Sequence, residues 1–130
     1  MKHLNTYITE YIIKKKLDKP IDSEYQYVPK TKQELIENLN ELISKDIYDF
    51  NCMNTSAITD MSYLFKGICI DRNFNVSDWN VSKVTNMQEI FYNCKEFNCD
   101  LSNWDVSKVE DTTVMFYNCN SLKNKPKWYK

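Results

Sequence analysis

Residues 79–94 read WNVSKVTNMQEIFYNC, and residues 104–119 read WDVSKVEDTTVMFYNC. The two stretches share their tryptophan, the VSKV string and the FYNC string in the same order at a spacing of 25 residues. A weaker copy precedes them at a spacing of 26, in which Ser56, Ile58, Thr59, Met61 and Phe65 match Ser82, Val84, Thr85, Met87 and Phe91. Three consecutive copies of one unit therefore make up most of the chain from residue 49 onward.

A unit of this length cannot bury its own apolar face, so neighbouring units must stack to form a core. Thr85 and Gln88 have the spacing of a capping box ahead of apolar residues, which predicts one or two helical turns in each unit. The Trp-Asn-Val-Ser or Trp-Asp-Val-Ser stretch before it is expected to be extended. We therefore predict an α+β repeat solenoid of about three units. Gly67 is the single glycine, so turns with positive φ fall largely to Asn and Asp.

Two helices are predicted ahead of the repeats. Leu4, Tyr7, Ile8, Tyr11 and Ile12 follow the spacing of one helix face and predict an amphipathic helix within residues 1–20. Residues 21–48 are expected to hold a linker and a second helix from Thr31 to about Lys45, with Thr31 and Glu34 as a capping box. That helix is expected to cover the N-terminal end of the repeat domain, residues 49–130, and Pro126 to Lys130 are expected to close the other end.

Residues 97–109, FNCDLSNWDVSKV, followed by Met115 and Phe116, are similar to the repeat of BspA-like leucine-rich-repeat proteins, the DUF285 group of bacterial surface-protein repeats. The resemblance covers residues 49–130 and implies a right-handed, leucine-rich-repeat-like stack used for protein binding and, in secreted members, for adhesion. The opening MKHLNTYI and the string PKTKQEL at 29–35 also resemble the N-termini of such proteins encoded by Bacteroidales bacteria and their phages. Secreted members carry a signal or a lipobox, and we expect neither in this chain.

Composition argues against several functions. The formal net charge of -1 gives no electrostatic reason to bind nucleic acid or an acidic membrane. One glycine cannot build a P-loop or a dinucleotide-binding loop, so no nucleotide cofactor is expected. His3, the single histidine, lies near a terminus, which disfavours a catalytic triad. Asp78, Asp100, Asp105 and Asp111 have the positions of turn residues that bond their own backbone, and we predict that the chain is not an enzyme.

The five cysteines are an odd number, which argues against a complete disulfide framework, and they include no Cys-x-x-Cys pair, which argues against a metal site of the usual spacing. Cys94 and Cys119 occupy equivalent positions and are expected to be small apolar core residues. Thr9, Glu10 and the lysines 14–16 interrupt the apolar residues of the N-terminus, so no export signal or membrane span is expected. A cytoplasmic or virion-associated location with reduced thiols follows as the expectation.

The candidate partner-binding residues come from the repeats and from the first helix. Tyr92 and Tyr117 follow packed phenylalanines and are expected to be exposed, while Lys83 and Lys108 are candidates for the same surface. Trp79 and Trp104 form either a structural ladder or an exposed aromatic strip. Leu4, Ile8 and Tyr11 would carry docking or self-assembly through the first helix.

A regular array with no evident chemical site predicts a non-enzymatic protein-binding module whose partner the sequence does not identify. Two alternatives stay open: a structural or cargo component of a phage particle or another assembly, and an inhibitor of a host or phage defence protein.

Overall fold

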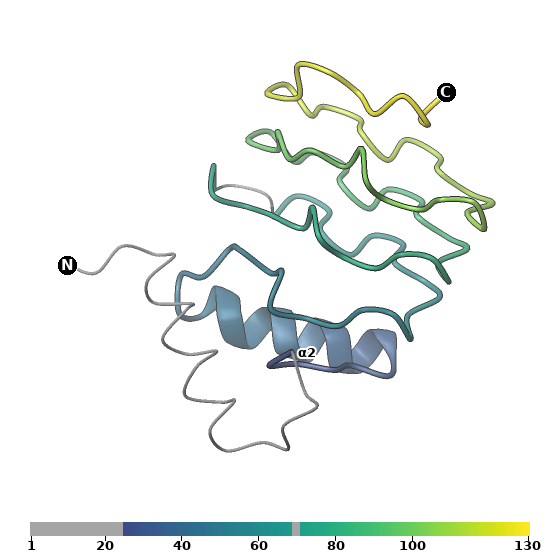
Figure 1. Ribbon diagram of the computed structural model, residues 1–130. Coiled ribbons are helices and arrows are strands. Elements are labelled where there is room, and N and C mark those ends of the chain that lie inside the picture. Colours follow the sequence, from purple (N-terminus) through teal and green to yellow (C-terminus); the bar gives the residue numbers. More distant parts are fainter. Residues whose placement is uncertain (1–24, 69–70) are drawn as a thin grey trace.

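The computed structural model describes residues 25–68 and 71–130, and within them it has one helix, α2 (Lys32–Ile43), and no strand or sheet (Figure 1). The predicted α+β repeat solenoid is therefore wrong, and so is the leucine-rich-repeat-like stack. The β-bridges of the described chain are isolated and parallel, and they join Tyr27 to Met53, Asp49 to Asn75, Asp60 to Asn86, and Asn86 to Asp111. A strand needs a run of extended residues, and here the chain turns after each bridge. The predicted helix with Leu4, Ile8 and Tyr11 lies outside the described residues.

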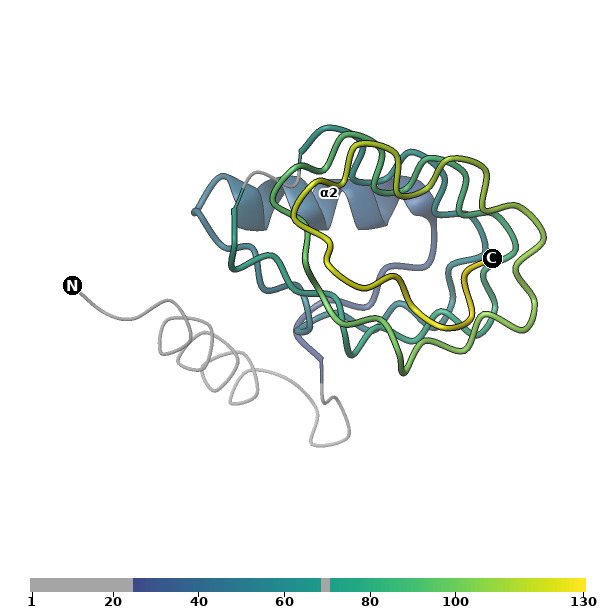
Figure 2. The ribbon, with the colours of Figure 1, turned by 90° about the horizontal axis from the view of Figure 1, so that it is seen from above.

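Helix α2 forms where the capping box predicted it. The Thr31 hydroxyl accepts a hydrogen bond from the backbone N–H of Glu34 at 3.1 Å, and the Glu34 carboxylate accepts one from the N–H of Lys30 at 2.7 Å. Leu35, Leu39 and Leu42 form the buried face of the helix. Within the described chain, no helix has the length and apolarity that a membrane crossing requires. Figures 1 and 2 show that α2 lies at the N-terminal end of a series of irregular turns, which follow one above another towards residue 130.

Asparagine and aspartate begin the corners of these turns, as the shortage of glycine predicted. Each side-chain oxygen accepts a hydrogen bond of 2.9 to 3.1 Å from the N–H two residues further on. The corner residues recur at the repeat spacing in three sets: Asp49, Asn75 and Asp100; Asn54, Asn80 and Asp105; and Asp60, Asn86 and Asp111. The bonds at Asp100, Asp105 and Asp111 confirm these three as turn residues. Hydrogen bonds from the side chain and the backbone N–H of the residue two positions on lower the pKa of each of these carboxyl groups.

The two FYNC strings and the matching residues of the first copy lie in three equivalent stretches, which we call the first (60–68), second (86–94) and third (111–119) ladder segments. The helical turns predicted there are wrong. In the second segment Glu89 and Asn93 have φ values of 53° and 59°, which an α-helix does not admit. Alternate residues close turns within the segment, as when the N–H of Ile90 donates to the carbonyl of Met87 at 3.2 Å. The residues between them donate to the next segment, as when the N–H of Phe91 bonds the carbonyl of Met115 at 3.1 Å.

A column of phenylalanine rings forms the centre of the core. Phe50, Phe65, Phe91 and Phe116 stack in order with centroid separations of 5.9, 5.8 and 5.8 Å and interplanar angles of 8° or less. Two further rings pack beside the column. Phe74 lies edge-on to Phe65 at 4.8 Å, and Phe97 is stacked on Phe91 at 4.2 Å. Rings in these geometries stabilise the fold beyond the burial of their area.

The third ladder segment contains a strained residue. Val114 has a φ of 45°, although a branched Cβ is disfavoured at positive φ, and its side chain is 42% exposed. We expect Val114→Asn to raise the free energy of unfolding by about 1 kcal/mol, because asparagine tolerates this conformation and little burial is lost. Urea denaturation measures the change. Val28→Asn, at a valine of 39% exposure that is not at positive φ, is the matched control and should give no gain; an equal gain at both sites would refute relief of strain.

Candidate functional site

The ladder segments present six side chains on one surface, which we call the tyrosine face: Tyr63, Lys66, Glu89, Tyr92, Val114 and Tyr117. The apolar buried residues of the second segment are Met87, Ile90, Phe91 and Cys94. Three of these positions are also buried in each of the other segments, as Met61, Leu64 and Phe65 in the first and as Met115, Phe116 and Cys119 in the third. The six members of the tyrosine face alternate with these buried residues in the chain, and they are exposed or half-buried. Because the three segments are equivalent, members at matching positions lie beside one another on this face.

Lys66 links the first two segments on the tyrosine face. Its ammonium group lies 2.9 Å from the Glu89 carboxylate, 4.7 Å from the Tyr92 ring centroid and 5.6 Å from the Tyr63 ring centroid. The hydrogen bond from Lys66 to Glu89 raises the pKa of the ammonium group. The lysine is therefore held as a cation against two aromatic rings.

Tyr92 and Tyr117 continue the face to the third segment. Their rings are stacked with a centroid separation of 4.9 Å and an interplanar angle of 16°. Tyr92 is half-buried, while Tyr117 is 51% exposed, so the outer surface of this pair is open to solvent. The exposure predicted for Tyr117 is confirmed.

A polar depression of about 580 Å³ lies at the edge of the tyrosine face and is lined by Gly67, Asn93, Lys95, Glu96 and Asn118. The amide nitrogen of Asn118 donates to the side-chain oxygen of Asn93 at 2.9 Å. These two asparagines directly follow Tyr92 and Tyr117 in the chain. The aromatic surface is thus bordered by amide groups that can donate and accept hydrogen bonds.

The predicted tryptophan and lysine candidates lie elsewhere. Trp79 and Trp104 are 3% and 4% exposed, and their indole N–H groups donate to the carbonyls of Phe50 at 2.8 Å and Val76 at 3.0 Å. They form the structural ladder, and the alternative of an exposed aromatic strip is wrong. Lys83 and Lys108 are exposed in the VSKV corners, but neither has an ion pair or cation–π contact with the described residues of the tyrosine face.

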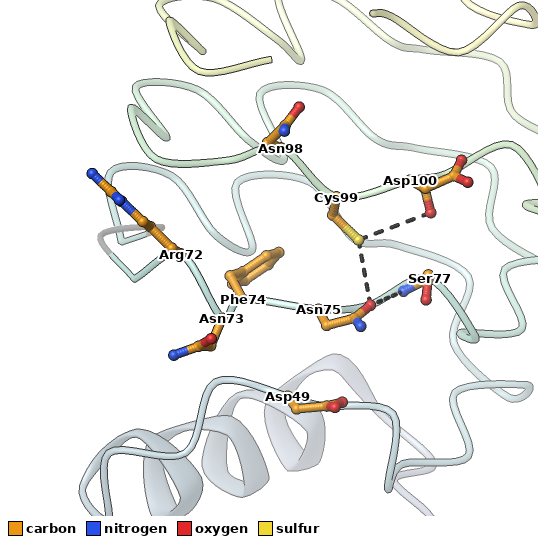
Figure 3. Close-up of a pocket in the computed structure, with 9 residues that line it drawn as sticks. All are labelled: Asp49, Arg72, Asn73, Phe74, Asn75, Ser77, Asn98, Cys99 and Asp100. Carbon is orange, nitrogen blue, oxygen red and sulfur yellow. Dashed lines mark hydrogen bonds between the residues drawn. The ribbon is translucent and has the colours of Figure 1, made fainter. Parts of the chain in front are cut away.

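A second depression, of about 390 Å³, lies beside the first corner set (Figure 3). It brings Asp49, Arg72, Cys99 and Asp100 together with asparagine side chains. The Cys99 thiol lies 3.5 Å from the side-chain oxygen of Asn75. Burial raises the pKa of Asp49, partly opposed by the hydrogen bond from Asn51, and burial raises the pKa of Cys99 to about 11. A thiol protonated at neutral pH is a poor nucleophile, so this arrangement does not favour covalent chemistry.

The described cysteines are core residues. Cys94 is fully buried and Cys119 is 9% exposed, as predicted, and their thiols donate to the carbonyls of Phe65 at 2.9 Å and Phe91 at 3.0 Å. Cys52 is also buried, and Cys99 is half-buried. Among the residues that the structure describes, no group of three His, Cys, Asp or Glu side chains is placed to hold a metal ion.

Four members of the tyrosine face, namely Tyr63, Lys66, Glu89 and Val114, were not predicted from the sequence. The signal was present, because Tyr63, Glu89 and Val114 follow one another at spacings of 26 and 25 residues. Lys66 likewise precedes Tyr92 by 26 residues and is its equivalent in the first segment. Extending the repeat alignment to these positions would have found them.

In the part of the chain that the structure describes, successive irregular turns follow helix α2 and present an exposed aromatic surface on the repeated segments. The model of the family described as "Mycoplasma protein of unknown function, DUF285" matches residues 31–130, and the chain belongs to this family. The DUF285 resemblance of the repeat is thereby confirmed, while the BspA-like and Bacteroidales assignments stay predictions. No curated protein and no solved structure matches the chain.

Proposed function

We propose that this chain is a non-enzymatic module that binds a protein partner through the tyrosine face. The observation that supports it is the distribution of exposed apolar residues. Five large hydrophobic residues are exposed in the described chain, and three of them, Tyr63, Val114 and Tyr117, belong to the face. A fourth, Ile68, lies in the first ladder segment, as Tyr63 does. Tyrosine is enriched in protein interfaces, because its ring buries area while its hydroxyl keeps a hydrogen-bonding group.

The arrangement of the face favours a protein partner. Its rings are fixed by stacking and by Lys66, so little conformational freedom is lost when they are covered. Apolar Val114 and the charged pair of Lys66 and Glu89 lie among the rings. A surface of aromatic, apolar and paired charged groups bordered by amides has the composition of an interface centre with a polar rim.

The test places a photo-crosslinking phenylalanine derivative at Tyr63 and irradiates the chain in the cells that produce it. We expect cross-linked adducts of defined mass that decrease at least about tenfold in the double variant Tyr92→Ala/Tyr117→Ala, because aromatic residues near an interface centre contribute most of the affinity. Quantitative mass spectrometry of the adducts is the measurement.

The matched control is Lys83→Ala/Lys108→Ala, a pair of exposed residues at the same repeat spacing. These variants should keep the adducts, and circular dichroism should show that all variants are folded. Adducts that survive the tyrosine changes, or that disappear equally with the lysine changes, would contradict binding through the tyrosine face.

A further inference from the structure

Backbone hydrogen bonds between the ladder segments all run in one direction. The first segment donates to the second over 2.7 to 2.9 Å, through the N–H groups of Met61, Tyr63, Phe65 and Gly67 and the carbonyls of Asn86, Gln88, Ile90 and Tyr92. The second segment donates to the third over 2.8 to 3.1 Å, through the N–H groups of Met87, Glu89, Phe91 and Asn93 and the carbonyls of Asp111, Thr113, Met115 and Tyr117. Each segment therefore presents a row of donors to the segment that follows.

The third ladder segment is built in the same way. Its carbonyls at Thr112, Val114 and Phe116 accept turn hydrogen bonds of 3.2 Å from residues 115, 117 and 119. The equivalent donor row consists of the N–H groups of Thr112, Val114, Phe116 and Asn118. None of these N–H groups has an acceptor among residues 25–68 and 71–130. This edge lies at the end of the molecule away from α2 (Figure 1), and it presents donors without acceptors.

Val114 is a strained residue at the centre of this edge. Its counterparts Tyr63 and Glu89 also have positive φ, and there the N–H groups bond the carbonyls of Gln88 and Thr113 at 2.9 and 3.0 Å. Val114 has the same backbone conformation at φ 45° with a branched side chain, yet its N–H has no such bond within the described chain. Strain of this kind without a compensating contact is concentrated at binding sites.

Two columns of stacked aromatic rings end near this edge, one of phenylalanines and one of Tyr92 and Tyr117. The phenylalanine column is closed at Phe116, where the Tyr129 ring packs edge-on at 4.9 Å and 79°. The column of Tyr92 and Tyr117 is open, because within residues 25–68 and 71–130 the Tyr117 ring stacks on Tyr92 alone and the residue is 51% exposed. Between the second and third segments, Tyr117 makes two contacts. Its carbonyl accepts the hydrogen bond from the N–H of Asn93, the last donor of that row, and its ring stacks on the ring of Tyr92.

From these observations we infer that the edge of residues 112–118 binds a peptide segment of the protein partner through its backbone. Carbonyl oxygens on alternate residues of that segment accept the N–H groups of Thr112, Val114, Phe116 and Asn118, and an aromatic side chain stacks on Tyr117. This inference rests on the proposed function, and it adds the way in which the backbone of the partner is bound. Backbone pairing of this type supplies affinity, and the side chains supply specificity.

A second copy of the chain does not fit the edge. Two such edges facing one another would bring donors against donors. Head-to-tail pairing would need the acceptor side of the first ladder segment, and α2 lies there. Lys32 of α2 contacts the Ser62 hydroxyl at 3.0 Å and the Asp60 carboxylate at 3.6 Å. Neither pairing of the ladder segments of two copies is therefore possible, and the occupant that we infer is a segment of a different protein.

The test titrates the full ¹⁵N-labelled chain with the blocked peptide DTTVMAY, which copies residues 111–117 with alanine in place of the phenylalanine that Tyr129 would obstruct. We expect amide shift changes and slowed hydrogen exchange at residues 112, 114, 116 and 118. The amides of residues 87, 89, 91 and 93, which are already bonded, should not change. An ester in place of the peptide's Met-Ala amide should weaken binding about fivefold, because an ester carbonyl is the poorer acceptor.

The outcomes separate this inference from the proposed function. No shift at the four amides at millimolar peptide, or shifts confined to side chains, would overturn backbone docking. If the tyrosine variants still lose the cross-linked partner in that case, the proposed function stands without this mode. Shifts at the four amides that the ester weakens, and that Tyr117→Ala also weakens, support it.

Discussion

Phe91→Ala is expected to lower the free energy of unfolding by about 3–5 kcal/mol. The Phe91 side chain is fully buried and contacts five other rings: Phe65, Phe74, Phe97, Trp104 and Phe116. Its removal interrupts the phenylalanine column at its centre and leaves a cavity that the surrounding turns, fixed by corner hydrogen bonds, cannot fill. Urea denaturation followed by tryptophan fluorescence measures the loss.

Tyr117→Ala is the control for Phe91→Ala. It removes an aromatic ring one unit further along the chain at a position that is 51% exposed, and it should cost about 1 kcal/mol or less. Equal losses in the two variants would show that the column is not the core of the fold.

The buried residues were predictable from the repeats, but the backbone that connects them was not. Burial at Met87, Ile90, Phe91 and Cys94 has the spacing of one helix face, so the pattern alone indicates a helix. The chain instead alternates turn bonds with bonds to the next segment, and positive φ at Glu89 prevents a helix. A glutamate in that conformation is uncommon, and the sequence contains no glycine that would signal it.

The absence of strands in the described chain has a related cause. Corner residues such as Asn75, Asn80 and Asn86 bond the N–H two positions on, which turns the chain before a second bridge can form. The sequence suggested extended Trp-Asn-Val-Ser stretches because it contains the apolar residues of a strand. The corner asparagine in such a stretch, Asn80, instead bonds the backbone N–H of Ser82, and this competes with the hydrogen bonds that a strand would make.

The candidate site was predicted in part. Tyr92 and Tyr117 were found because each follows a phenylalanine of the core. The two tryptophans could not be assigned from the sequence, since an indole serves equally well in a core or on a surface. The bonds from Trp79 to Phe50 and from Trp104 to Val76 are made between residues far apart in the chain, and only the fold reveals them.

Native Cys99 is expected to react with iodoacetamide about 100-fold more slowly at pH 8 than the same cysteine in the unfolded chain. Burial raises its pKa from 9.0 to about 11, and a shift of about two units lowers the thiolate fraction about 100-fold. Cys99 is the half-buried member of the described cysteines, so the reagent reaches it more readily than the others. Mass spectrometry of each cysteine peptide after timed alkylation gives the rate.

The pH profile separates ionisation from access, because restricted access lowers the rate at every pH without moving the midpoint. The rate for native Cys99 should rise with pH to a midpoint near 11, while the chain in guanidinium should show a midpoint near 9.0. Cys69 lies outside the described residues and is changed to serine in all samples. A native midpoint near 9.0 would contradict burial of the Cys99 thiol.

The same raised pKa values make the fold sensitive to alkali. Burial raises the pKa of Cys52 to about 11 and that of Cys119 to about 12, so these thiols stay protonated in the folded chain at a pH where they ionise in the unfolded chain. Their contribution to stability is complete below pH 9 and is lost as the pH rises from 9 through 12. The midpoint of thermal unfolding should therefore fall over that range, and Cys119→Ala should fall less steeply, because this thiol no longer ionises on unfolding.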